Sequence, residues 1–168
     1  METTFPEAFP SALRSQSAIA VSALKLSSDY VSDQFSVNVL GEILRIPCRV
    51  LPSTRPEFVG VNVQQRQIAL CMLTRSADGF ARQAALREVL HINEPWSIPF
   101  VIALIGEYVV EIIDDVYAAL PDLEKANPAF YKLTCDRVVS YWDLYYRRQF
   151  PRSDYVGFKL LRQLDAYA

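Results

Sequence analysis

The chain has 168 residues, of which 51% are hydrophobic and 21% charged, so it is long enough to bury a core and too apolar to be disordered throughout. Its 17 basic and 19 acidic side chains give a formal net charge of −2, which excludes a whole-chain bias towards nucleic acid or an anionic membrane. Cys48, Cys71 and Cys135 are widely spaced and odd in number, so we expect neither a disulfide framework nor a zinc site.

Residues 1–16 contain two prolines and few periodic apolar positions, which predicts a mobile N-terminal arm in front of a single helical domain over 17–168. Glu2 and Glu7 make the start of the chain acidic, whereas a signal peptide needs a basic start. The longest apolar run, residues 96–105, is about half the length that spans a bilayer. We therefore expect a cytoplasmic protein without a membrane segment.

Residues 17–33 have the apolar spacing of a helix, and residues 35–51 are compatible with two structures. Alternating apolar residues on both sides of Gly41 are typical of a β-hairpin. The same segment also shows a helical spacing, in Val31, Phe35, Val39 and Ile43. Pro47 would end a helix and is tolerated only at a sheet edge. We favour a helix ending near Leu44 with an extended segment near 42–51 that continues to Pro56, and the hairpin remains the alternative.

Two clearer helices are predicted over residues 61–75 and 80–90, separated by the helix-breaking pair Asp78-Gly79. Small and apolar residues follow at helical spacing, in Ala81, Ala85, Leu86 and Val89. With Arg82 four residues after Asp78, the stretch over residues 64–90 resembles one unit of a HEAT-type helical repeat. The resemblance implies antiparallel helix pairs and protein binding. It also implies structural roles for Asp78 and Arg82, which would tie turn to turn by charge-assisted hydrogen bonds.

Three further helices follow from capping signals in the second half of the chain. Pro95 opens a long helix over residues 96–120, Pro128 opens one that runs to Arg148, and Ser153 caps a last helix that ends near Leu164. The predicted fold is therefore mainly α. Its helices would pack as antiparallel pairs in a HEAT-like α-helical bundle or short solenoid, with one extended segment near 42–51.

Four carboxylates interrupt the otherwise apolar helix predicted over residues 96–120, and their spacing places them on one narrow stripe. We call them the acidic stripe: Glu107, Glu111, Asp114 and Asp115. A solvated or Arg-paired strip is the simplest interpretation, and a groove for a cation, a metal or an Arg-bearing partner is the functional one. The single histidine, His91, lies outside this helix, so the stripe lacks the ligands of a di-metal carboxylate site.

Aromatic and basic residues are interleaved near residues 137–152, where we expect the partner-binding surface. Its residues are Tyr141, Trp142, Tyr145, Tyr146, Arg147 and Arg148. Tyr, Trp and Arg are the preferred anchors of protein interfaces, although a core face with Arg stems at its rim explains the pattern too. Aromatic residues among arginines also suit nucleic acid, but the basic excess is small and no nucleic-acid-binding motif is present.

No catalytic signature, phosphate-binding glycine loop or metal-ligand set is recognisable, so we predict no catalytic residue, no metal and no cofactor. The leading functional hypothesis is a non-catalytic protein-interaction or scaffold module. Its partner would be a protein or a second copy of the chain, with the acidic stripe meeting the arginines. The alternatives are a small enzyme that uses the acidic stripe and a nucleic-acid binder that uses residues 137–152.

Overall fold

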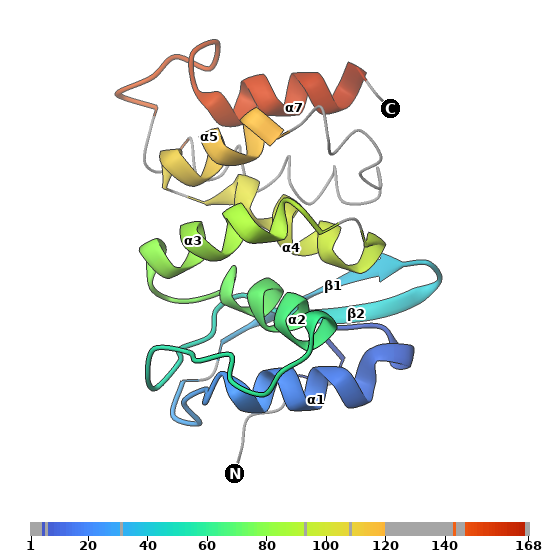
Figure 1. Cartoon of the computed structure of the whole chain (residues 1–168). Helices are drawn as coiled ribbons and strands as arrows, with labels where there is room; N and C mark the ends of the chain where they lie inside the picture. The colour runs from blue at the N-terminus through green and yellow to red at the C-terminus, as the bar shows by residue number, and fades with distance from the viewer. Residues whose placement is uncertain are drawn as a thin grey trace. The chain divides into compact units, whose positions relative to one another are not determined.

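The computed structural model describes residues 5, 7–30, 32–92, 94–107, 109–119, 143 and 147–166. The described part is mainly helical and contains one antiparallel β-hairpin (Figure 1). The chain divides into two compact units, Met1–Phe100 and Val101–Ala168, which we call unit 1 and unit 2. The mainly α prediction is confirmed at this level, and its HEAT-like arrangement stays a prediction.

Unit 1 begins with a short 3-10 helix, η1 (Ser11–Leu13), that leads into α1 (Arg14–Ala23). The hairpin β1 (Gln34–Val39) and β2 (Glu42–Pro47) follows, and then come α2 (Val63–Leu73) and α3 (Gly79–Val89). Helix α1 packs against α2, and α2 packs against α3, with the hairpin beside them in Figure 1. The unit ends with η2 (Pro95–Ser97) and the first residues of α4 (Ile98–Ile102).

The structure has the hairpin, so our preferred prediction of a helix ending near Leu44 with an extended segment after it is wrong. Val37 pairs with Leu44 and Val39 with Glu42 across a two-residue turn. Leu40 and Gly41 both have positive φ, of 51° and 89°, which is the backbone of a type I′ hairpin turn. Val37, Val39, Leu44 and Ile46 are buried, so the period-two pattern wins because one face of the hairpin covers the core.

Local capping explains why α2 and α3 match their predicted ranges. Asn62 and Gln65 form a capping box at the start of α2, because each side chain accepts a hydrogen bond from the other residue's backbone N–H. The Asp78 carboxylate accepts from the N–H of Phe80 and caps α3. Buried Arg75, just after α2, donates to the carbonyls of Pro47 and Cys48 and thereby ties the end of β2 to this helix pair.

Part of the segment that we expected to be a mobile arm, residues 1–16, packs into unit 1. Phe9 is 2% exposed; its ring stacks on Phe100 at 5.1 Å between centroids and meets the Trp96 ring edge-on at 5.7 Å. The carbonyl of Glu7 accepts a hydrogen bond from the N–H of Arg45 at 2.7 Å. Among the described residues of this segment, Ala8 and Phe9 therefore belong to the core of unit 1.

Unit 2 continues α4 into the 3-10 helix η3 (Ala103–Gly106), followed by α5 (Val110–Ala119) and α7 (Val156–Ala166). Helices α5 and α7 pack against each other (Figure 1). The prediction of one continuous helix over residues 96–120 is wrong, because Glu107 has extended backbone with φ −80° and ψ 158°. The helix predicted over residues 128–148 lies almost wholly outside the described residues. None of the described helices is both long and apolar enough to cross a membrane.

Candidate functional site

The predicted partner surface falls mostly outside the described residues, which include neither Tyr141, Trp142, Tyr145 nor Tyr146. Arg147 and Arg148 are described, and both are exposed. The guanidinium of Arg147 lies 3.1 Å from the carboxylate of Asp143, four residues earlier in the sequence, with both side chains more than half exposed. Exposed ion pairs of this kind contribute little to stability.

The acidic stripe is split by the break before α5. Glu107 is 2% exposed and lies in the extended residues that precede the helix. Glu111 and Asp114 are exposed on α5, and Asp115 is half-buried. Three of the four carboxylates therefore stay together on one helix, and the fourth is buried before that helix begins.

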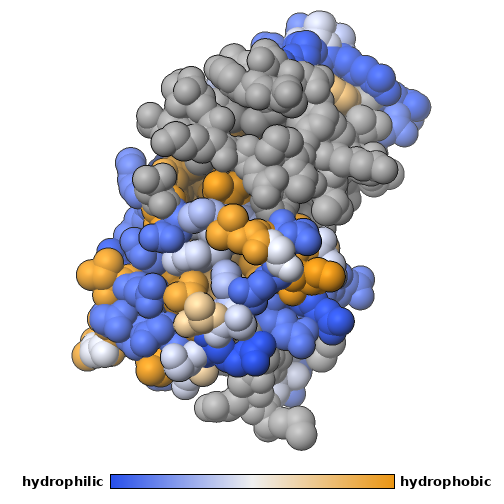
Figure 2. Space-filling model, turned by 90° about the vertical axis from the view of Figure 1, so that its right-hand side faces the viewer, coloured by the Kyte–Doolittle hydropathy of each residue, from blue (hydrophilic) through white to orange (hydrophobic). Residues whose placement is uncertain are grey.

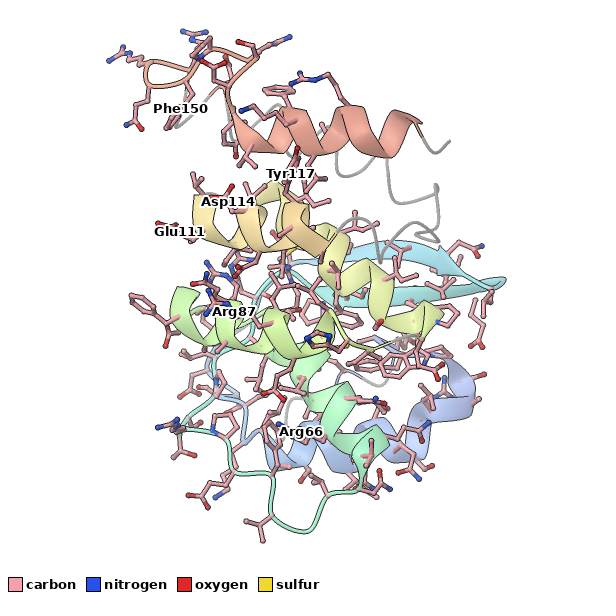
Figure 3. All side chains as sticks on the ribbon, turned by 45° about the horizontal axis from the view of Figure 1, so that its top comes forward. Arg66, Arg87, Glu111, Asp114, Tyr117 and Phe150 are labelled. Carbon is pink, nitrogen blue, oxygen red and sulfur yellow. The ribbon has the colours of Figure 1, made fainter. Side chains whose placement is uncertain are left out.

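A pocket of about 330 Å³ opens where α5 meets α7 and the turn before it, entirely within unit 2. Figure 3 shows Tyr117 between the two helices, Asp114 one turn earlier on α5, and Phe150 on the segment that leads into α7. The lining contains two carboxylates, one ammonium group and three aromatic rings. The lining residues are Val110, Asp114, Tyr117, Phe150, Asp154, Tyr155, Val156 and Lys159.

Hydrogen bonds within the turn before α7 hold the part of the pocket wall that this turn provides. The N–H groups of Asp154 and Tyr155 both donate to the carbonyl of Pro151, at 2.9 and 3.2 Å. Tyr155 is 1% exposed and its ring meets that of Phe158 edge-on at 5.9 Å. The guanidinium of Arg152 lies 5.5 Å from the centre of the Phe158 ring. These contacts hold Tyr155 in place, while Asp154 and Lys159, which also line the pocket, are exposed.

Asp114 lines this pocket and has a carboxyl pKa that is shifted from its ordinary value. Partial burial raises the pKa of its carboxyl, and the neighbouring carboxylates of Glu111 and Asp115 raise it further. The ammonium group of Lys159 acts in the opposite direction and lowers the pKa of Asp114. Two neighbouring carboxylates against one ammonium group mean that a further cation would be stabilised next to ionised Asp114.

Sequence reasoning found the carboxylates of α5 and missed the other side of the pocket. Tyr117, Phe150 and Lys159 come together only because α7 packs on α5, and no local pattern indicates that pairing.

Asp78 and Arg82 lie at the α2–α3 turn in unit 1, away from any described pocket. Arg82 is fully buried and donates to the carbonyls of Ser76 and Ala77 at 2.7 and 3.1 Å. The geometry gives both residues a structural role, with Asp78 acting as the helix cap.

The described residues contain no group of three or more His, Cys, Asp or Glu side chains that could hold a metal ion. Burial raises the pKa of the Cys71 thiol well above its ordinary value, which disfavours the thiolate form that a nucleophile needs. No protein-family model matches the chain, and comparisons with curated proteins and with solved structures found no match either.

Proposed function

We propose that the chain is a non-catalytic protein-interaction module whose α5–α7 pocket accepts a cationic side chain of a partner protein. The observation that carries this proposal is the combination of aromatic rings and excess carboxylate in one small open pocket. Aromatic faces attract guanidinium and ammonium groups, and carboxylates bind them by charge-assisted hydrogen bonds. The resemblance of residues 64–90 to a HEAT-type unit belongs to the same proposal, because it implies the same class of function.

The size and charge of the pocket favour one side chain over a cofactor. A volume of about 330 Å³ is at the small end of ligand sites. Asp114 and Asp154 outnumber Lys159, so an incoming arginine or lysine restores neutrality where a phosphate or a carboxylate would not. The arrangement therefore supports a basic partner segment as the ligand.

The test is titration of the full chain with N-acetyl-argininamide and with its neutral citrulline analogue, followed by amide chemical shifts. We expect the cation alone to shift the signals of Asp114, Tyr117 and Phe150. Equal shifts with the citrulline analogue, or none with either ligand, would overturn the proposal.

Asp114→Asn should weaken binding of the arginine derivative by about tenfold, because one charge-assisted hydrogen bond is lost. The folded state disfavours the ionised carboxyl, so stability from the raised pKa of Asp114 is present at low pH and lost as pH rises through that pKa. The variant therefore stays folded at neutral pH, and a binding loss cannot be ascribed to unfolding. Glu57→Gln, at an exposed carboxylate of unit 1, is the matched control and should bind normally.

The affinity of the wild-type chain should also rise with pH through the pKa of Asp114, because only the ionised carboxyl attracts the cation. The Asp114→Asn variant should lose most of that rise. Isothermal titration at several pH values measures both effects. A wild-type affinity that does not change with pH would show that Asp114 is not part of the site.

A further inference from the structure

The outer edge of β1 is a row of main-chain groups that point away from β2. The N–H of Arg45 donates to Glu7, so Arg45 faces away from β1, and its cross-strand partner Ser36 faces away from β2. Since strands alternate with period two, Gln34 and Asn38 point the same way as Ser36. In the described part of the chain, the main-chain groups of Gln34, Ser36 and Asn38 neither donate a hydrogen bond to another segment nor accept one from it.

The two edges of the hairpin differ in how they are protected. The β2 edge carries the charged Arg45 and ends in Pro47, and it is bonded to Glu7. The β1 edge, Gln34–Val39, has no charged residue and no proline, and its outward residues Gln34, Ser36 and Asn38 are exposed. Natural sheets protect open edges with charges, prolines or bulges, so an unprotected edge indicates a docking site.

The sequence of β1 fits a copy of itself. In antiparallel pairing about Ser36, the serine lies opposite Ser36 of the second copy, and Gln34 lies opposite Asn38 of the second copy. These pairs set neutral amides and hydroxyls against one another, so no like charges meet across the twofold axis. The three outward residues would then exchange main-chain hydrogen bonds with their counterparts.

We propose that β1 pairs with β1 of a second copy of the chain, antiparallel about Ser36, so that the two hairpins form one four-stranded sheet. Figure 2 views the side of the molecule to which the hairpin turn projects, and apolar residues reach the surface there among hydrophilic ones. At this turn Leu40 is 81% exposed and Ile43 is 68% exposed. Pairing would satisfy, in both copies, the main-chain N–H and C=O groups of the β1 edge that the described residues leave unbonded, which gives the association its driving force.

The test compares the full-length chain with charge variants at the twofold axis, by sedimentation over a range of concentrations. Wild type should dimerise, and Ser36→Lys or Ser36→Glu alone should each weaken dimerisation by about tenfold or more, because like charges meet directly. An equimolar mixture of the two variants should restore association, which an unfolded variant could not do. Thr54→Lys places the same charge on an exposed loop of unit 1 and should dimerise like wild type.

Hydrogen exchange of the wild-type chain supplies a second readout. The amides of Gln34, Ser36 and Asn38 should become protected as the concentration rises, while the amides of Val37 and Val39, already bonded to β2, should not change. A monomer at all concentrations would overturn the proposal. Dimerisation that Ser36→Lys leaves intact, or a dimer without protection of these amides, would overturn it as well.

Discussion

Leu40 is a residue whose backbone conformation conflicts with its type. Its φ of 51° lies in the left-handed region, which costs an L-residue other than glycine, asparagine or aspartate about 1–2 kcal/mol. Its side chain is 81% exposed, so little packing repays that cost. Asn-Gly is the preferred pair at a type I′ turn, and this chain has Leu-Gly.

We therefore expect Leu40→Asn to raise the free energy of unfolding by about 0.5–1 kcal/mol, as measured by urea denaturation. Leu40→Ala is the control, because it removes the same apolar surface and keeps the unfavourable φ. A gain of equal size in both variants would assign the effect to the exposed leucine instead of the backbone.

The same residue explains why the hairpin was hard to predict. An Asn-Gly pair between alternating apolar runs would have identified the turn, whereas Leu40 extends the apolar pattern through it. Val31, Phe35, Val39 and Ile43 happen to fall at helical spacing too. Only burial of Val37 and Leu44 on one face decides between the two periods, and burial is a tertiary property.

At the scale of elements, local capping made some helices predictable. Asn62 and Asp78 begin α2 and α3 by bonding backbone groups two or three residues away, so the sequence alone contains the signal. The break before α5 has a weaker signal, the single Gly106, and apolar residues that run on both sides of Gly106 and Glu107 outweighed it. The prediction of a continuous helix failed there for that reason.

At the α2–α3 turn, we expect two substitutions to lower the free energy of unfolding by different amounts. Asp78→Ala removes a helix cap, which costs about 1 kcal/mol. Arg82→Ala removes a fully buried side chain that bonds two carbonyls, so we expect a loss of about 2–4 kcal/mol. Urea midpoints of the two variants measure the difference. Equal losses, or a larger loss for Asp78→Ala, would contradict the assigned roles.

At the scale of the whole molecule, the sequence does not indicate which distant segments meet. Phe9 packs on Trp96 and Phe100, so unit 1 is closed by residues from its two ends. Asp114 and Lys159 are more than 40 residues apart in the sequence, and they share a pocket because α7 packs on α5. Neither pairing leaves a periodic or capping signal, which explains why the N-terminal segment was expected to be mobile and half of the pocket was missed.

The closure of unit 1 can be tested at Phe9. Its ring is buried against two aromatic rings, so Phe9→Ala should lower the free energy of unfolding by about 3–5 kcal/mol. Phe80→Ala is the matched control: the Phe80 side chain is 87% exposed, and its loss should change stability by no more than about 0.5 kcal/mol. Urea denaturation followed by tryptophan fluorescence reports on the contact itself, because Trp96 is one of the two rings that Phe9 touches. If residues 1–16 were a detached arm, the two substitutions would have the same small effect and the fluorescence of the folded state would not change.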